Sequence, residues 1–430
     1  MPEPTETSQT PSKINNRNPA FSALRHRDFR LLWMGQIVSV TGSWMQLVAI
    51  NWHVYQLTRS PFALGMVGLF RGVPIILCSL VGGVVADAMD RRRLMIGTQS
   101  VMIASATALT FFTLAGSKTV WPIYILTGIA SGATAFDIPA RQALMPMLVP
   151  ARDFPNAVSV SLVVFNVAMI AGPAAAGFIL ASHGPAVVYG INAVSFVAVI
   201  AALLAMKTSG RLDTESGQAD QVNRVSYAAL KEGLAFVWRT PVIVQTMTLD
   251  FAATFFASAT ALLPIFAEEI LHVGARGLGL MAAAPAVGSV ITALLIARTG
   301  SFRKQGRVVI WSIAVFGLAT VAFGLSRAFW FSLVMLAITG AADTVSTVLR
   351  QTIRQLATPN YLRGRMTSIN MVFFMGGPQL GEVEAGFVAA LIGAPLSVIT
   401  GGLGSLLAAL LAAVKAKALR DYESEHERDK

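Results

Sequence analysis

Long apolar stretches alternate with short polar segments along most of the chain, and this alternation is the strongest pattern in the sequence. A helix needs about 20 mostly apolar residues to cross a bilayer. Runs of this size occur at 31–57, 62–86, 94–115, 120–147, 158–181, 186–206, 242–267, 276–297, 308–326, 329–357, 366–392 and 395–416. Lipid offers the backbone no hydrogen-bond partner, and the alternating strands of about ten residues that form membrane barrels are absent. The pattern therefore predicts an all-α membrane protein with twelve transmembrane helices.

The apolar runs form two sets of six, separated by a polar segment. We expect a six-helix bundle at 21–207, a cytoplasmic linker at 208–240 and a second bundle at 241–416. The flanking segments are predicted cytoplasmic tails, at 1–20 and 417–430. The first of these is polar and rich in Pro, Ser, Thr and Asn, without the apolar core of a signal peptide, so it is expected to be disordered.

Short sequences recur in the two sets of runs. Three pairs share an offset of 209 residues and a fourth has an offset of 214: Arg141-Gln142 with Arg350-Gln351, Pro150 with Pro359, Ala176-Gly177-Phe178 with Ala385-Gly386-Phe387, and Leu64-Gly65 with Leu278-Gly279. One such pair can arise by chance, but a shared offset across three pairs indicates a repeat. Parallel repeats of this kind are typical of transporters whose binding site lies between the halves. We therefore expect two pseudo-symmetric bundles around a central site.

Composition and charge support this interpretation. Hydrophobic residues make up 54% of the chain and charged residues only 13%, against about 25% in a soluble domain. The net charge of +11 does not indicate nucleic-acid binding, because the basic residues sit in short clusters between apolar runs. If both termini are cytoplasmic, 28 of the 33 Lys and Arg residues lie on the cytoplasmic side. The charge pattern predicts a multi-pass protein of the bacterial inner membrane with both termini in the cytoplasm.

A Gly, Asp and Arg motif follows the second apolar run, with the sequence Gly82-Gly-Val-Val-Ala-Asp-Ala-Met-Asp-Arg-Arg-Arg93. It resembles the cytoplasmic loop signature of the major facilitator superfamily, although Ala88 and Asp90 depart from that pattern. The resemblance implies a gating motif formed by Gly83, Asp87, Arg91 and Arg92, in which Asp87 makes a contact that exists in one state only. Alternatively, the arginines only determine topology.

Further segments resemble one branch of that superfamily, the branch of the enterobactin exporter and related efflux proteins. They are 131–146, 342–365 and 381–386, and the resemblance extends over roughly 21–415. It implies the twelve-helix fold and an efflux direction. In the fifth run, Gly172, Pro173 and Gly177 are similar to the helix-bend motif associated with antiporters, except that Ala176 replaces the first glycine of the closing pair. Gly and Pro at these positions can also serve packing alone.

Ionisable residues inside the apolar runs are candidates for the substrate and proton pathway, because each is costly in a membrane. Arg71 and Asp250 lie about 14 Å and 12 Å into their helices at 1.5 Å per residue, so we expect them to line the central cavity. Asp250 either binds the coupling proton or forms a static ion pair, for instance with Arg71. Trp44, in the middle of the first helix, either stacks on substrate or packs in the core.

Three more carboxylates belong to the same candidate pathway. Asp343 and Arg350 share a helix face but lie about two turns apart, which predicts no direct contact between them. Arg350 and Arg354 crowd that end of the helix, which favours a structural role for Asp343. Glu382 and Glu384 point about 200° apart on their helix, so only one of them can face the cavity. The proton-binding hypothesis rests on Asp250, Asp343 or Glu382, because a membrane interior penalises an unpaired charge.

The sequence contains no nucleotide-binding loop, catalytic triad or metal-ligand grouping, and Cys78 is the sole cysteine. We therefore expect no enzyme activity, no cofactor and no metal. The favoured hypothesis is a monomeric, proton-coupled exporter of an amphipathic small molecule, such as a siderophore or a drug, working by alternating access in the lipid bilayer. The alternatives are a lipid or lysophospholipid translocator and a non-transporting membrane sensor on the same fold.

Overall fold

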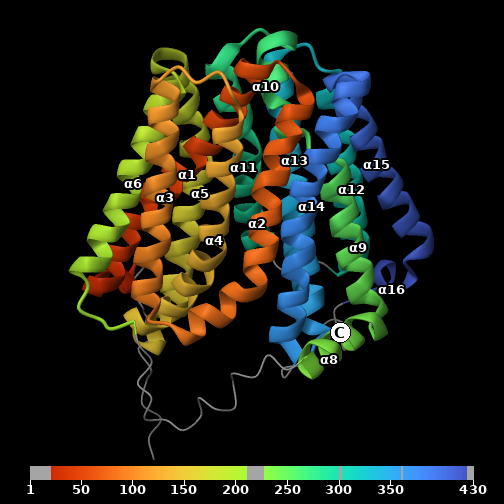
Figure 1. Ribbon diagram of the computed structural model, residues 1–430. Helices are drawn as coiled ribbons and strands as arrows, with labels where there is room; N and C mark the ends of the chain where they lie inside the picture. The colour runs from red at the N-terminus through yellow and green to blue at the C-terminus, as the bar shows by residue number, and fades with distance from the viewer. Residues whose placement is uncertain (1–20, 211–226, 300–302, 360–361, 424–430) are drawn as a thin grey trace, which may run out of the picture.

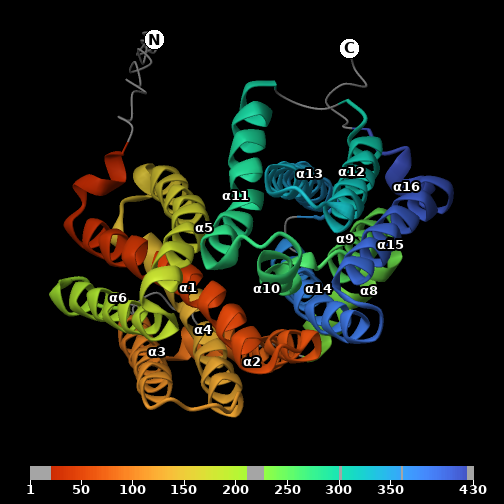
Figure 2. The same ribbon diagram turned by 90° about the horizontal axis from the view of Figure 1, so that it is seen from above.

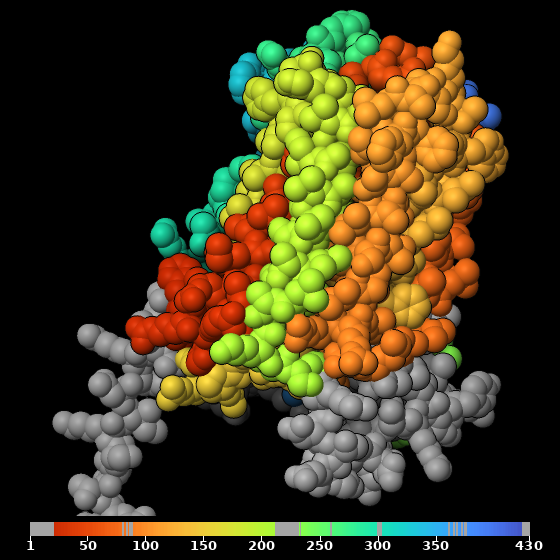
Figure 3. Space-filling view, turned by 60° about the vertical axis from the view of Figure 1, so that its left-hand side comes forward, coloured from red at the N-terminus to blue at the C-terminus, as the bar shows by residue number. Residues whose placement is uncertain are grey.

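The computed structural model describes residues 21–210, 227–299, 303–359 and 362–423, which form helices and loops with no strand among them. The N-terminal half contains α1 (Arg27–Thr58), α2 (Pro61–Ala88), α3 (Arg91–Leu114), α4 (Trp121–Leu148), α5 (Phe154–His183) and α6 (Pro185–Ala205), with 3-10 turns at Ser22–Arg25 and Ala151–Asp153. On the outer face of this half, α6 runs between α1 and α3 (Figure 3). The tail predicted at 1–20 lies outside the described residues.

The C-terminal half begins with α8, at the place where the sequence shows a short amphipathic piece. Its helices are α8 (Tyr227–Arg239), α9 (Pro241–Phe256), α10 (Leu263–Ile265), α11 (Gly274–Thr299), α12 (Gln305–Leu325), α13 (Phe329–Leu356), α14 (Arg363–Ile392), α15 (Ala394–Lys415) and α16 (Lys417–Arg420). The last of these packs on α9 and α12, so the segment predicted as a tail begins with a docked helix. Most of the predicted linker, at 211–226, and residues 424–430 lie outside the described residues.

The run predicted as one helix at 242–267 is interrupted in the structure. After α9 ends at Phe256, the chain passes through a 3-10 turn (Ala259–Leu262), α10 and a π-helix (Phe266–Ile270). The Ser258 hydroxyl lies 2.7 Å from the Thr254 carbonyl near the end of α9 and 3.2 Å from the Pro378 carbonyl of α14, so it shares its one proton between an acceptor at the break and the neighbouring helix. A kink in a membrane helix is tolerated where a neighbouring helix supplies partners for the backbone, and here the Ser405 hydroxyl of α15 donates to the Ala253 carbonyl near the end of α9 at 3.1 Å.

Ten helical segments of the described residues are long and apolar enough to cross a membrane. The helices α1 and α14 are not among them, although they are 32 and 30 residues long. At 1.5 Å per residue they measure about 45–48 Å, longer than the hydrocarbon core of a bilayer. Both lie alongside apolar helices, α1 against α5 and α6, and α14 against α2 and α9 (Figure 1). The all-helical membrane fold is confirmed, and the number of twelve crossings stays a prediction.

The bundle has two ends that differ in what they contain. We call the end with the 3-10 turn Ser22–Arg25 and α16 the terminal end, and the opposite one the distal end (Figure 1). At the distal end, Gly184 alone connects α5 to α6, and Gly393 alone connects α14 to α15. Their φ angles of +75° and +88° favour glycine. These two residues are 209 positions apart, which extends the sequence repeat to the backbone.

The halves share one hydrophobic core at the distal end only. A single cluster of buried side chains there contains Tyr55 and Tyr189 of the N-terminal half together with Phe266 and Phe323 of the C-terminal half. Toward the terminal end, the cluster around Met95 draws its described residues from the N-terminal half, and a separate cluster around Ile353 draws them from the C-terminal half. The halves are therefore packed together distally, while their cores are separate at the terminal end.

Candidate functional site

A cavity of about 340 Å³ opens inside the N-terminal half, between α1, α2, α3, α4, α5 and α6. Its charged and aromatic lining consists of Trp44, Arg71, Asp137, Arg141, Phe165 and Phe196. Its neutral polar lining consists of Gln36, Ser39, Ser43, Gln46, Gln99, Thr127, Ser131, Thr134 and Asn192. A mostly apolar wall with a few convergent polar groups is typical of a small-molecule site.

The aromatic part of the wall comes from Trp44 and Phe165, whose rings meet edge to face at 6.1 Å and 71°. The Trp44 side chain also packs against α5, because a Cβ built on Gly172 would lie 2.6 Å from the Trp44 Cβ. Any larger residue at position 172 would push α5 away from α1. The stem of Trp44 therefore packs against a helix while its ring lies on the cavity wall, and stacking on substrate stays a prediction.

Arg71 lines the cavity and reaches the other half of the molecule. Its guanidinium lies 3.7 Å from the carboxylate of Glu382 on α14, and the two side chains are only 20% and 14% exposed. Gly68, one turn away on α2, makes room for the Glu382 side chain, because a Cβ there would lie 2.6 Å from the Glu382 Cβ. Arg71, the example considered as an ion-pair partner of Asp250, pairs with Glu382 instead, and Asp250 pairs within its own half.

Glu384 lies two residues further along α14 and is half-buried. No ion pair or hydrogen bond of its side chain occurs among the described residues. Glu382 and Glu384 have different surroundings because side chains two positions apart on an α-helix point about 200° apart. Glu382 and Glu384 therefore offer a paired and an unpaired carboxylate on one helix.

A second polar group lies inside the N-terminal half at the cavity wall. The fully buried Asp137 carboxylate accepts hydrogen bonds from Thr98, at 3.0 Å, and from Gln99, at 2.9 Å, and pairs with Arg141. The Arg141 side chain is 29% exposed and lines the cavity. Arg141 was not among the predicted site residues, although its recurrence as Arg350 in the sequence was a signal that could have identified it.

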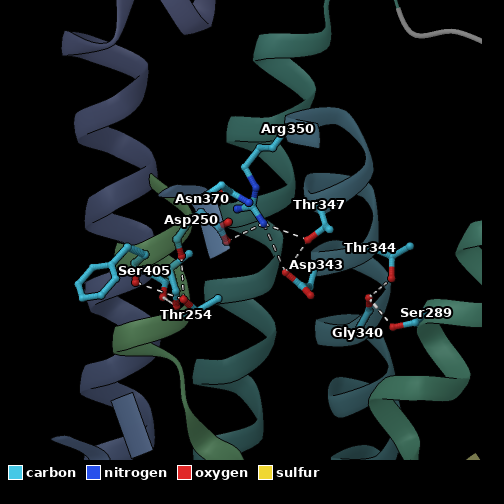
Figure 4. A network of polar contacts seen from close by, with 12 residues as sticks. Asp250, Thr254, Ser289, Gly340, Asp343, Thr344, Thr347, Arg350, Asn370 and Ser405 are labelled. Atoms are coloured by element: carbon cyan, nitrogen blue, oxygen red, sulfur yellow. Dashed lines mark hydrogen bonds and ion pairs between the residues drawn. The ribbon is translucent and has the colours of Figure 1, made fainter. Parts of the chain in front are cut away.

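The matching group in the C-terminal half is a buried charge network centred on Arg350, whose side chain is 1% exposed (Figure 4). Its guanidinium lies 2.8 Å from the Asp250 carboxylate and 3.8 Å from that of Asp343. Arg354 lies 3.7 Å from the other Asp250 oxygen. The predicted separation of Asp343 from Arg350 is wrong, because the long arginine side chain reaches back along α13 and closes the distance of two turns.

Asp250 and Asp343 differ in their access to solvent. The Asp250 side chain is 5% exposed and contacts two arginines, whereas the Asp343 side chain is 50% exposed. Asp250 therefore forms its ion pairs within one half, with Arg350 and Arg354.

Pairs of glycines bring the halves together at the distal end (Figure 2). The helices α5 and α11 meet at Gly177 and Gly279, where a Cβ on Gly177 would lie 2.8 Å from the Gly279 Cα. The helices α2 and α14 meet at Gly65 and Gly386, where a Cβ on Gly386 would lie 2.6 Å from the Gly65 Cα. These are the glycines that repeat in the sequence, and Pro173 of the bend motif contributes a carbonyl to the α5–α11 contact.

Polar contacts reinforce the same end. Tyr55 at the end of α1 donates a hydrogen bond to Glu269 on the π-helix, and Arg59 lies 3.6 Å from Glu268. The pKa of Arg59 is raised, first by its contact with the Tyr55 hydroxyl and further by the Glu268 carboxylate. Both contacts join the two halves, so the distal end is closed by apolar, glycine and ionic contacts together.

The predicted gating motif is described only in part. The structure does not describe the surroundings of Gly83 or the side chain of Asp87, near the end of α2. Arg91 is buried and donates to Met147, while its backbone N–H donates to the Gly210 carbonyl at 3.2 Å. Arg92 donates to the Leu204 carbonyl at 3.2 Å. These two arginines thus tie α3 to α4, to α6 and to the chain beyond α6.

Known proteins resemble this chain in both sequence and fold. Macrolide efflux protein A of Streptococcus pyogenes is 24% identical over 85% of this chain and 90% of its own length. Enterobactin exporter EntS of Salmonella choleraesuis is 24% identical over 92% of this chain and 94% of its own length. A solved bacterial homologue of the human lysosomal transporter Spinster, in an inward-facing and unoccupied conformation, has a TM-score of 0.71 at 14% identity, covering 93% of this chain and 98% of that one.

The relatives are transporters of small molecules, and no catalytic family is indicated. The fold and the long apolar helices identify a multi-pass membrane protein. The family model described as "Transmembrane secretion effector" matches residues 18–429, nearly the whole chain. This protein therefore belongs to the transmembrane secretion effectors, a family of efflux transporters within the major facilitator superfamily.

Proposed function

We propose that the protein is a proton-coupled exporter of an amphipathic small molecule and that its terminal end faces the cytoplasm. The orientation follows from the basic residues, because Lys and Arg are concentrated on cytoplasmic loops. Few of them lie at the distal end of the described residues: Arg59, Lys118 and Arg327 in connections, and Arg276 in the first turn of α11. In this orientation the protein is closed toward the outside, so the cavity would be loaded from the cytoplasm.

The cavity chemistry supports an amphipathic cargo. Trp44, Phe165 and Phe196 offer aromatic surface, and the amide and hydroxyl side chains around them offer donors and acceptors. Arg71 and Arg141 carry two positive charges and Asp137 one negative charge, which favours a substrate rich in hydrogen-bond acceptors. The relatives named for macrolides and enterobactin make these two compounds suitable first probes.

The observation that carries the proton coupling is the Arg71–Glu382 pair, because it joins the two halves at the cavity wall. When the distal end is closed and the pair with Arg71 forms, Glu382 becomes ionised and releases its proton to the cytoplasm. Substrate that engages Arg71 weakens the pair and allows α2 and α14 to separate. Glu382 then takes up a proton from the outside as substrate leaves, and it releases that proton when the pair forms again. Each cycle exports substrate and imports one proton.

The test compares Glu382→Gln with Glu384→Gln, which alters the neighbouring carboxylate without an ion pair. Cells lacking endogenous pumps are loaded with a macrolide or with enterobactin, and efflux is followed with and without a dissipated pH gradient. We expect wild type and Glu384→Gln to export only with the gradient, and Glu382→Gln to lose gradient-driven export. Export by Glu382→Gln that still follows the gradient would refute the coupling role, and no export of any probe by wild type would argue for the sensor alternative.

One observation favours a lipid translocator as a second candidate. A smaller pocket of about 180 Å³ has mostly apolar walls, including Phe29, Leu32 and Trp33, and shares Gln36 and Arg141 with the main cavity. Such a pocket could admit an acyl chain beside the polar site. Vesicles containing a fluorescent lysophospholipid would distinguish the candidates, because a translocator moves the lipid between leaflets and an exporter of macrolides leaves its distribution unchanged.

A further inference from the structure

A groove on the outer face of the C-terminal half combines apolar walls with a basic end. It has a volume of about 320 Å³ and runs between α12 and α15. Its walls include Trp311 and Ala314 of α12 and Leu406 and Leu410 of α15. From Arg307 to Ala314 it follows α12 for seven residues, about 10 Å at 1.5 Å per residue. The groove is separate from the cavity of the N-terminal half.

Two arginines, Arg307 and Arg420, close the terminal end of the groove. Arg420 is held in place by its neighbours, because it donates to both oxygens of Asp421, at 3.0 and 3.3 Å, and to the Ala413 carbonyl at 3.1 Å. The pKa of Asp421 is lowered, first by this bond from Arg420 and also by Arg307 and Lys417, so the carboxylate stays ionised and keeps Arg420 oriented. A guanidinium has five N–H donors, so Arg420 retains two for a ligand.

The short helix α16 is built to place Arg420 over the groove. Gly306 at the start of α12 allows this approach, because a Cβ there would lie 1.6 Å from the Leu419 carbonyl oxygen. The Leu419 side chain is fully buried, and its N–H donates to Gln245 of α9 at 2.9 Å. No hydrogen bond or ion pair to Arg307 occurs among the described residues, so its donors are available. The basic end is thus a fixed feature of the fold.

We propose that this groove binds an anionic phospholipid, with the phosphate on Arg307 and Arg420 and one acyl chain between α12 and α15. The mouth of the groove is complementary to an anionic headgroup, because the positive charges of Arg307, Arg420 and Lys417 exceed the one negative charge of Asp421. A basic pocket between membrane helices at the headgroup level is the expected recognition site for such a lipid. Bound lipid would hold α16 on α12 and, through Leu419 and Gln245, on α9, and would stabilise the C-terminal half.

The test measures thermal unfolding of the full chain in neutral detergent during titration with phosphatidylglycerol, phosphatidylcholine or inorganic phosphate. We expect phosphatidylglycerol alone to raise the unfolding temperature. The double variant Arg307→Gln with Arg420→Gln should bind it about 30-fold more weakly, from the attraction of two surface arginines. The matched control, Arg276→Gln with Arg327→Gln, removes the same charge from exposed distal positions and should respond as wild type does.

Two further variants keep the result interpretable if loss of Arg420 disturbs α16. Arg307→Gln alone leaves the hydrogen bonds of α16 intact and should weaken the binding of phosphatidylglycerol about fivefold. Ala314→Phe fills the groove without changing its charge and should also weaken the binding of phosphatidylglycerol. An equal response to phosphatidylcholine, a full response to inorganic phosphate, or equal responses of the double variant and its control would each overturn the proposal.

Discussion

The glycine contact between α5 and α11 allows a quantitative test of how the distal end closes. In Gly279→Ala, the new Cβ would lie 2.5 Å from the Pro173 oxygen and 2.7 Å from the Gly177 Cα. The second distance is about 0.7 Å shorter than the 3.4 Å at which ordinary contact begins. The neighbouring atoms are backbone and cannot rotate away, so the halves must move apart at this point.

The expected cost falls on one conformational state only. Overpacking a close contact by one methyl group costs about 1–3 kcal/mol. The gain in helix propensity from glycine to alanine is present in both states, because α11 stays helical when the halves rock, so it cancels in their equilibrium. A difference of about 1–3 kcal/mol shifts a two-state equilibrium about 5–150-fold toward the state that is open at the distal end.

Electron–electron distance measurements between spin labels report this shift directly. Lys118 and Arg327 are exposed in distal connections of different halves, so cysteines at these positions, in a Cys78→Ser background, carry the labels. Gly279→Ala should increase the long-distance population. The control is Gly97→Ala on α3, where a Cβ meets no atom within 4 Å and the distances should not change. A folded Gly279→Ala protein with the wild-type distance distribution would refute the reasoning.

Three further predictions follow from the same structure. Gly386→Ala should open the distal end as Gly279→Ala does, since its Cβ would lie 2.6 Å from the Gly65 Cα; unchanged spin-label distances would contradict this. Asp250→Asn should lower stability by about 3–5 kcal/mol, because it leaves Arg350 buried without its closest charged partner. Thermal unfolding measures this loss, and an equal loss in Asp343→Asn would argue against it. Trp44→Ala should raise the substrate concentration needed for half-maximal efflux, whereas Trp330→Ala, an exposed tryptophan that does not line the cavity, should not.

The sequence predicted much of the fold because a bilayer imposes strict requirements on helix length and hydrophobicity. The two sets of apolar runs correspond to the two halves, and the repeated glycines lie where the halves touch. The break after Phe256 was not predicted, because the local sequence is apolar and continuous. At this break the Ser258 hydroxyl contacts the Pro378 carbonyl of α14, a residue 120 positions away. Hydropathy carries no information about such a partner.

The candidate site was predicted less well, since ion pairing depends on which helices are neighbours. Arg71 was expected in the cavity and lies there, but its partner, Glu382, belongs to a helix of the other half. Depth along a helix could not distinguish Asp250 from Glu382 as that partner. The contact between Arg350 and Asp343 was excluded from helical spacing alone, which ignores the reach of an arginine side chain.

The charged pairs divide into two classes that fit alternating access. Asp137 with Arg141, and Asp250 with Arg350, lie within one half each and move with it as the halves rock, so they keep each half rigid. The pairs Arg71 with Glu382 and Arg59 with Glu268 join the halves and must break when the distal end opens. A substrate or proton can only shift the equilibrium through groups whose contacts differ between the states. For this reason we propose Glu382, and not the more deeply buried Asp250, as the carboxylate that couples proton movement to transport.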